Sequence, residues 1–164
     1  MLIRRATYDD LERMKELFAC AREYMKKSGN PTQWKNDRPN INIVLNDIAR
    51  NNSYVIEDND DNIIATFACI KGVEPTYIDI DGKWLNDDEY VTIHRIASDG
   101  SRRGIFDEII KYCKKFNCDI RIDTHKDNKT MIHLIEKNGF EYCGIIIVDD
   151  GTPRLAYQKL CRKY

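Results

Sequence analysis

Two glycine-rich phosphate-binding motifs are missing from this chain of 164 residues, which contains neither GxxxxGKS/T nor GxGxxG. Their absence argues against a P-loop and against a dinucleotide-binding fold. No CxxC pair is present either, and the six cysteines are scattered, mostly within apolar stretches. We therefore expect free thiols in a reducing, cytoplasmic environment and no metal site. A disulfide framework or a zinc site is the less favoured alternative.

The chain also lacks an excess of one charge, a long apolar run and a linker. It carries 26 basic and 27 acidic residues, whereas a general nucleic-acid binder usually has a clear basic excess, so no nucleic-acid partner is expected. No window approaches the roughly 18 apolar residues of a membrane span. The start is polar by position 7, without the apolar core of a secretion signal. With no repeat or Pro/Ser-rich tract, residues 1–164 are expected to form one domain.

Hydrophobic periodicity predicts helices and strands in a definite order. The helices are expected at 7–29, 40–52, 104–116 and 127–139, and the strands at 1–6, 53–58, 62–72, 91–97, 119–124, 140–150 and 154–160. Thr7 and Asp10 have the spacing of a capping box, and "NDDN" at 59–62 is typical of a hairpin turn. The order β-α-α-β-β-β-α-β-α-β-β predicts an α/β fold of the mixed α+β kind. Its centre is a mixed, largely antiparallel sheet of about seven strands flanked by about four helices.

The segment "SDGSRRG", residues 98–104, connects a predicted strand to a predicted helix through a flexible and cationic turn. Gly100 and Gly104 permit positive φ, and the backbone amides that open the helix have no partner within it. Such amides favour an anion, to which Arg102 and Arg103 would add charge. The alternative is an ordinary strand-to-helix connection with solvated arginines.

The residues of this turn and of the helix at 127–139 match a known pattern. "SRRGIF", residues 101–106, follows Arg/Gln-x-x-Gly-x-Gly/Ala in part, with Gly104 as the central glycine; Asn128 opens the later helix, and Gly139 and Phe140 close it. On these residues the chain resembles the GCN5-related N-acetyltransferase (GNAT) superfamily over nearly its full length. The resemblance implies that the anion in the turn is the pyrophosphate of acetyl-CoA, the acetyl donor.

The resemblance also implies a set of acetyl-CoA-binding positions in the strand, the turn and the two helix starts. They are Ile96, Ala97, Ser98, Gly100, Ser101, Arg102, Arg103, Gly104, Ile105 and Asn128. In this family a backbone amide near the end of the strand contacts the developing oxyanion, which here means Ile96, Ala97 or Ser98.

Three positions depart from the family pattern. Ser101 stands where the family usually has Arg or Gln, and Phe106 where it has Gly or Ala. Ile135 occupies the position of a tyrosine that serves many members as general acid to the leaving thiolate. The resemblance implies direct transfer of an acetyl group to a primary amine of a small molecule or of an aminoacyl or peptide acceptor. A coenzyme A-binding module with weak or lost catalysis, motivated by Ile135, and a plain interaction domain are the alternatives.

Three side chains are candidates for proton transfer. His94 lies two residues before the expected oxyanion contact and is the candidate base; the alternative is a core histidine hydrogen-bonded within a central strand. Tyr142 and Tyr157, on the last two predicted strands, are the candidate acids, and of these Tyr142 is preferred. The alternative is that both pack, as tyrosines on strands usually do.

Two loops are expected to bind the acceptor of a monomeric or homodimeric enzyme. The segment 30–40 connects the first two helices, and the long segment 72–90 mixes aromatic with acidic residues. The mixture predicts a lid over a cationic, partly apolar acceptor; the alternative is a hairpin whose aromatic residues pack on the sheet. The candidate acceptor-binding residues are Trp34, Glu74, Tyr77 and Trp84.

Overall fold

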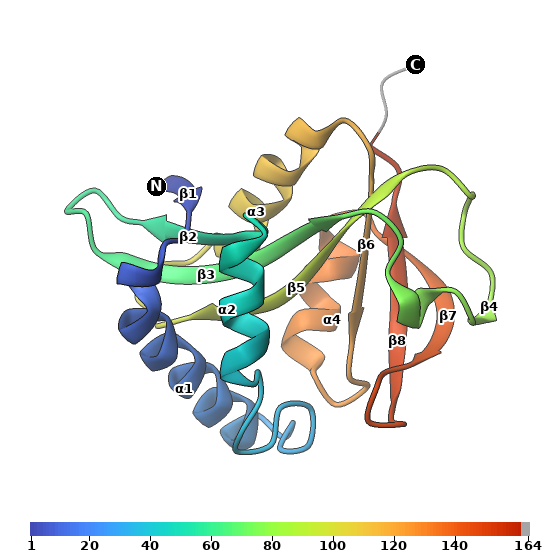
Figure 1. The fold of residues 1–164 in the computed structure, drawn as a ribbon. Helices are drawn as coiled ribbons and strands as arrows, with labels where there is room; N and C mark the ends of the chain where they lie inside the picture. Colours follow the sequence, from blue (N-terminus) through green and yellow to red (C-terminus); the bar gives the residue numbers. More distant parts are fainter. Residues whose placement is uncertain (162–164) are drawn as a thin grey trace.

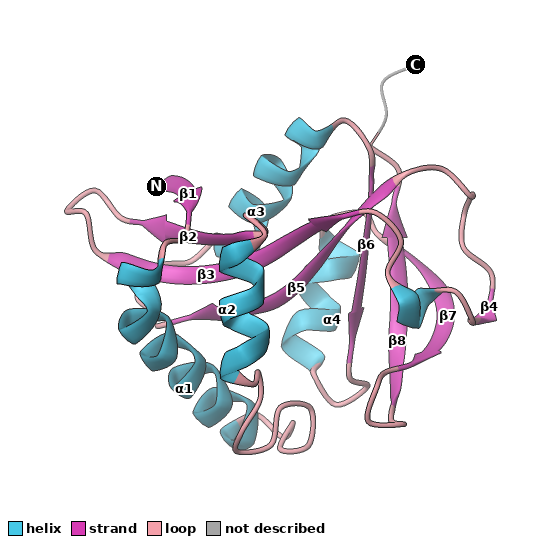
Figure 2. Ribbon diagram, viewed as in Figure 1, coloured by secondary structure: helices cyan, strands magenta, loops and turns pink. Residues whose placement is uncertain are grey.

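Residues 1–161, which the computed structural model describes, build one eight-stranded sheet with helices on both faces (Figures 1 and 2). The strands are β1 (Leu2–Arg5), β2 (Ser53–Glu57), β3 (Ile63–Lys71), β4 (Asp81–Gly82), β5 (Tyr90–Ser98), β6 (Asp119–Thr124), β7 (Glu141–Ile147) and β8 (Pro153–Lys159). They lie in the order β1-β2-β3-β5-β6-β8-β7-β4, and β5–β6 is the one parallel pair among them. The predicted mixed, largely antiparallel sheet is confirmed. It has one strand more than expected, because the segment 72–90 contributes β4.

The four predicted helices are present as α1 (Leu11–Lys27), α2 (Ile41–Ala49), α3 (Ile105–Cys113) and α4 (Lys129–Lys137). In Figure 1, α1 and α2 lie in front of the sheet, and α3 and α4 lie behind it. Strand β2 serves both layers: Val55 packs in the cluster with α1 and α2, whereas Tyr54 and Ile56 pack with α3 and α4. This alternation follows from strand geometry, since successive side chains point to opposite faces.

Local signals in the sequence set where these elements begin and turn. The Thr7 amide donates to the Asp10 carboxylate over 2.8 Å, as the capping-box spacing predicts, although the first turn, Tyr8–Asp10, is a 3-10 turn that leads into α1. The predicted hairpin between β2 and β3 is confirmed. Its turn is fixed by Asp58, whose Oδ1 accepts from the amides of Asp60 and Asn62.

Strands β5 and β6 diverge soon after they meet. Their parallel pairing covers only the positions Tyr90–Asp119, Val91–Ile120 and Thr92–Arg121, although β5 continues to Ser98 and β6 to Thr124. On its other side β5 pairs with β3, and there Arg95 and Ile96 both lie opposite the single residue Phe67. Such a β-bulge re-aims the strand, and this one carries a strained residue, because Arg95 has φ of 54°.

The segment 72–90 packs down on the half of the sheet formed by β7 and β8. Tyr77 is buried in a cluster with Tyr90, Ile146 and Ala156, and Trp84 packs against this cluster. The Trp84 Nε1 donates to the Tyr77 carbonyl over 2.9 Å. The aromatic residues are therefore held by the sheet itself, as the hairpin alternative anticipates.

Two broader expectations concern membranes and disulfides. Within residues 1–161, no helix combines the length and the apolar character needed to cross a bilayer. The six cysteines, all of which lie in this range, are free thiols, and four of them are buried.

Candidate active site

A cavity of about 430 Å³ opens where β5 and β6 diverge. Its walls come from the α1–α2 loop, β5, the end of β6, the start of α4 and the β7–β8 loop. The loops among these gather along the lower edge of Figure 1. Five residues predicted from the sequence line this cavity: Trp34, Glu74, His94, Ile96 and Asn128.

His94 and Glu74 form a hydrogen-bonded pair in the cavity wall. The distance from His94 Nε2 to Glu74 Oε2 is 3.2 Å, and both side chains are mostly buried. Glu74 is held further by the hydroxyl and the amide of Thr76, at 3.0 and 3.4 Å. The hydrogen bond from His94 is the main reason that the pKa of the Glu74 carboxyl falls to about 2. A carboxylate that orients an imidazole is the arrangement expected of a general base.

The lowered pKa of Glu74 predicts how the stability of the fold depends on pH. Because the folded-state pKa lies below the ordinary value of 4.5, the ionised carboxylate stabilises the fold above that value, and this contribution is lost as pH falls toward about 2. We expect wild type to exceed the Glu74→Gln variant by up to about 3 kcal/mol in free energy of unfolding at about pH 6. The advantage should fall to about half at about pH 3 in urea titrations. An equal advantage at both pH values would contradict the assignment.

Tyr77 does not line the cavity itself but is hydrogen-bonded to Asp123, a lining residue that the sequence did not predict. The Tyr77 hydroxyl donates to Asp123 Oδ2 over 2.6 Å, and Asp123 lines the cavity. Complete burial, together with the neighbouring Asp123 charge, raises the pKa of Tyr77 well above its ordinary value, so the phenol keeps its proton. Tyr77 therefore holds Asp123 in place from behind the wall.

The bulge in β5 is anchored from α2. Arg95 donates from Nε and Nη2 to the two carboxylate oxygens of Asp47, at 2.7 and 2.9 Å. Ile96, the other bulge residue, lines the cavity, whereas Ala97 is buried in the cluster with α1 and α2. Among the three positions predicted for the oxyanion contact, Ile96 is the one that faces the cavity. Neither the role of Asp47 nor the positive φ of Arg95 was expected, because nothing in "VTIHRIA" marks such a conformation.

The turn that was predicted to bind an anion is an exposed loop ahead of α3. Gly100 and Gly104 have φ of 77° and 79°, and a Cβ built on either would meet nothing within 4 Å. Ser101, Arg102 and Arg103 are exposed as well. The outer side of the loop is therefore open, and the glycines are needed for backbone conformation. The first amides of α3 have no partner within the helix, so they remain available to an anion.

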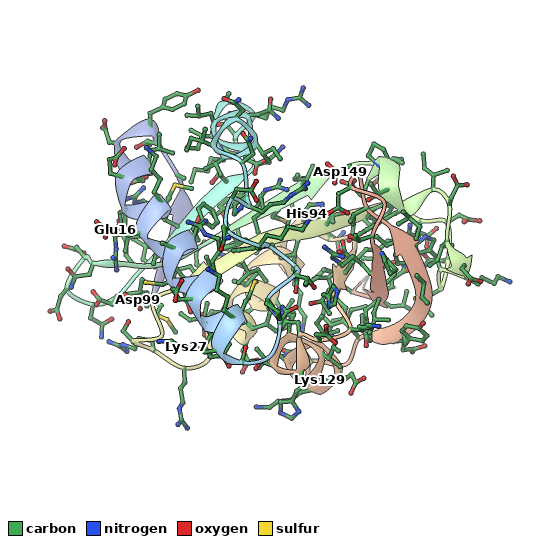
Figure 3. The ribbon with its side chains drawn as sticks, turned by 90° about the horizontal axis from the view of Figure 1, so that it is seen from below. Glu16, Lys27, His94, Asp99, Lys129 and Asp149 are labelled. Carbon is green, nitrogen blue, oxygen red and sulfur yellow. The ribbon has the colours of Figure 1, made fainter. Side chains whose placement is uncertain are left out.

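The Asp99 carboxylate holds the loop between β5 and α3 through two hydrogen bonds. Its Oδ1 accepts from the Ser101 amide over 2.9 Å, and its Oδ2 accepts from Arg13 of α1 over 2.8 Å. Figure 3 shows Asp99 beside α1, whereas His94 and Asp149, labelled elsewhere in the same view, both line the cavity. The loop and the cavity thus occupy different parts of the splayed strand β5.

Asn128 joins the start of α4 to the α1–α2 loop. Its Oδ1 accepts from the Met131 amide over 3.1 Å, which caps the helix, and its Nδ2 donates to Gln33 over 3.0 Å. A second link is the contact of 3.3 Å between Thr32 and His125. Burial and the Arg154 charge lower the pKa of His125.

The candidate acids do not line the cavity. Tyr142 is 56% exposed and meets the ring of Tyr157 edge-on, and Tyr157 packs in the core beneath α3 and α4. Ile135 is 0% exposed in the same core. Among the described residues, no tyrosine lines this cavity. The structure thus removes Tyr142 and Tyr157 from the groups that can reach an acceptor there.

The acidic run and Trp84 lie outside the cavity as well. Trp84, Asp87, Asp88 and Glu89 border a separate hollow beside β5. The guanidinium of Arg121 fills the space between the rings of Trp84 and Tyr90, at 4.1 and 4.0 Å from their centroids. The structure therefore does not bring Trp84 and the acidic run to the cavity that Trp34 and Glu74 line. Glu74 alone among the predicted acids lies in the cavity wall.

No group of three or more His, Cys, Asp or Glu side chains within residues 1–161 is arranged to hold a metal ion. The cavity therefore offers acid–base and hydrogen-bonding groups: one imidazole, three carboxylates, three arginines, two threonines and two amides. These groups are His94; Glu74, Asp123 and Asp149; Arg38, Arg95 and Arg154; Thr76 and Thr124; Gln33 and Asn128.

Comparison with solved structures shows which proteins share this architecture. A GNAT-family acetyltransferase from Streptococcus agalactiae 2603 is 34% identical to the chain, with a TM-score of 0.88 over 99% of this chain and 96% of that chain. The chain belongs to the GNAT family of acetyltransferases. The resemblance to the GNAT superfamily is thereby confirmed for the chain as a whole.

More distant GNAT structures share the fold. One is an acetyltransferase from Listeria monocytogenes 4b F2365, with 22% identity and a TM-score of 0.72 over 97% of this chain and 94% of that chain. Another is a phosphinothricin acetyltransferase from Sinorhizobium meliloti in complex with AcCoA, with 15% identity and a TM-score of 0.63 over 98% and 88%. No protein-family model and no curated protein matches the chain. GNAT membership supports acyl transfer in general and leaves the acceptor open.

Proposed function

We propose that this GNAT protein is an N-acetyltransferase that moves the acetyl group of acetyl-CoA directly to the primary amine of a small molecule or of an aminoacyl or peptide acceptor. The observation that carries the proposal is the His94–Glu74 pair, which lies in the cavity beside the β5 bulge. A base, a bulged strand and a cavity meet where the two central strands separate. An acetyl thioester and an amine have to meet in such a place if one is to attack the other.

The loop between β5 and α3 is the proposed binding site for the acetyl donor. The open outer side of Gly100 and Gly104 allows close approach to the amides that open α3, and Arg102 and Arg103 are exposed beside them. The Sinorhizobium meliloti relative in complex with AcCoA supports the use of this donor. Acetyl-CoA supplies an acetyl thioester, and a thiol ionises with a pKa of about 8.5, so it leaves without a dedicated acid.

His94 is the residue that takes a proton from the acceptor amine in this proposal. Glu74 orients the imidazole and stabilises the imidazolium that forms, because the carboxylate is ionised at neutral pH. Ile96 lines the same cavity. In this proposal its backbone amide supplies the oxyanion contact. Ile135 is buried in the core and takes no part.

A coenzyme A-binding module without turnover is the second candidate, and the absence of tyrosine from the described cavity lining favours it. The two are separated by measuring free thiol released from acetyl-CoA in the presence of a panel of primary amines. Thiol release that depends on the amine supports the transferase. If no amine promotes release, but acetyl-CoA raises Tm, the protein is the binding module.

The donor site predicts a specific effect of Gly104→Val. A β-branched residue is strained at φ near 79°, so the loop moves and a side chain stands over the amides that open α3. We expect the affinity for acetyl-CoA, measured by isothermal titration calorimetry, to fall about tenfold or more. Gly29→Val is the matched control, since Gly29 has φ of 87° and nothing within 4 Å of its Cβ position. Unchanged affinity in a folded Gly104→Val protein would remove this loop from the donor site.

A further inference from the structure

Arg154, at the start of β8, is a buried cation in the cavity wall with neutral partners. It is 6% exposed and lines the cavity. Its Nη1 donates to the Thr152 hydroxyl and to the Pro153 carbonyl, at 2.8 and 2.9 Å, and its Nη2 donates to the Gln33 carbonyl over 3.4 Å. Among the ion pairs formed within residues 1–161, none involves Arg154, whereas Arg38 and Arg95 in the same wall both have carboxylate partners.

A guanidinium in this position is costly without an anion. Burial of a charge is unfavourable unless a partner compensates it. Burial lowers the pKa of Arg154, although the nearby Asp123 and Asp150 carboxylates, which do not pair with it directly, oppose this shift. The neutral oxygens that accept from Arg154 satisfy some of the N–H donors of its guanidinium but do not neutralise its charge. A carboxylate entering from the cavity would do both, because its two oxygens match the planar guanidinium. The arrangement points to an anionic group on the ligand.

Carboxylates of the cavity wall lie near Arg154, so the anionic group of the ligand has to be small and close to a cationic group of the same ligand. Asp123 pairs with Ala156 in the β6–β8 register, and Arg154 lies two residues from Ala156 on the same face of the sheet. Diagonal neighbours in a sheet lie about 7–8 Å apart, so Arg154 and Asp123 face the cavity as adjacent charges without touching. Glu74 adds a second carboxylate on the side of His94. A short ligand with a positive and a negative end therefore matches the wall.

We propose that the acceptor is a free amino acid or a close analogue, with its carboxylate bound by Arg154 and its amino group directed to Asp123, Glu74 and His94. The proposal deepens the N-acetyl transfer proposed above and rests on it. In that transfer the neutral amine nitrogen bonds to the acetyl carbon and gives one proton to His94. The carbon–sulfur bond breaks, and its electron pair leaves with sulfur.

This acceptor replaces the cationic acceptor that the sequence predicts. That expectation rested on the acidic and aromatic composition of the segment 72–90, whose acidic run 87–89 borders a different hollow. The cavity itself is lined by both signs of charge: Arg38, Arg95 and Arg154 against Glu74, Asp123 and Asp149. Arg38 reaches Asp149 and Asp150 only at 3.7 and 3.9 Å, so it can add to the attraction for a carboxylate.

The test compares L-amino acids with the matching L-amino acid amides, which keep the amine and the side chain but lack the carboxylate. Free thiol released from acetyl-CoA gives kcat and KM for each member of a pair. For the preferred side chain, we expect kcat/KM to be at least about tenfold higher for the acid than for the amide. Equal values in wild type would overturn the proposal.

Arg154→Gln separates recognition of the carboxylate from catalysis. The variant should raise KM for the amino acid about tenfold or more and leave the amide nearly unaffected, whereas Arg154→Lys should retain part of the preference. Arg50→Gln, at an exposed position of α2's end, is the control for loss of a positive charge. Equal losses for acid and amide in Arg154→Gln would overturn the proposal. Should this variant not fold, the comparison in wild type decides.

The experiment also distinguishes the two proposals from each other. If no amine is acetylated, the N-acetyl transfer fails, and calorimetric titration of amino acids into the protein with coenzyme A still tests the carboxylate site. Binding that is lost in the amide supports the role of Arg154 without turnover. If amines are acetylated and carboxylates bring no advantage, the transfer stands and the amino-acid acceptor fails.

Discussion

Replacing His94 by alanine is expected to lower kcat about a hundredfold or more, the usual range for loss of a general base. Among the described residues that line the cavity, His94 is the one histidine, and Glu74 holds its imidazole at 3.2 Å. Steady-state release of free thiol from acetyl-CoA measures the loss. The acidic limb of the kcat profile should change in the variant, because the group whose protonation stops the reaction is no longer present.

The control for this experiment is His133→Ala. His133 is exposed on α4 and lies outside the cavity, so its replacement should leave kcat within about twofold, the size of an ordinary surface effect. The rise in Tm with acetyl-CoA should be the same in wild type and His94→Ala, because the donor loop is separate from His94. A loss of only severalfold in kcat, with an unmoved acidic limb, would return His94 to the role of a structural histidine.

The sequence predicts the fold well because its signals are local. The stripe along 104–116, the capping box of Thr7 and Asp10, and the hairpin turn at 59–62 each act over a few residues and agree with the final sheet. Gly104 was located in the same way, since an exposed loop that needs positive φ before a helix leaves few other choices. Such features depend little on the rest of the chain.

The composition of the active-site cavity could not be predicted, because it depends on which face a residue presents after folding. Glu74 and His94 are twenty residues apart, and they meet only because the segment 72–90 returns across the sheet. The same segment places Trp84 over Arg121 and away from the cavity. An aromatic and acidic composition does not distinguish a lid from a packed layer, so the sequence alone does not decide between these alternatives.

Burial and packing explain two further differences between the sequence-based expectations and the structure, which concern the candidate acids and residue 135. Tyr142 and Tyr157 are register partners on β7 and β8, and their rings meet each other away from the cavity. Ile135 is completely buried against α3, so a tyrosine in its place would overpack the core.

Asp47→Ala is expected to lower both stability and kcat. Removing the carboxylate leaves the Arg95 guanidinium half-buried without its partner, which costs about 3 kcal/mol in free energy of unfolding. The effect reaches the active site because Arg95 belongs to the bulge, has φ of 54° and is held in that conformation through two hydrogen bonds to Asp47. When Arg95 loses these hydrogen bonds, the bulge is no longer held, and the position of the neighbouring Ile96 at the cavity changes. Urea unfolding measures the stability, and thiol release measures kcat.

The double variant Asp47→Leu with Arg95→Met separates these two effects. Replacing both charges with apolar side chains removes the unpaired guanidinium, so most of the lost stability should return. The kcat should remain low, because an apolar contact does not fix the bulge as two directed hydrogen bonds do. Glu12→Ala, which breaks the exposed pair with Lys15 on α1, is the control and should change stability by less than about 1 kcal/mol. If the double variant regains full kcat together with its stability, the ion pair only supports the fold, and the positive φ of Arg95 is maintained by the strand and its neighbours alone.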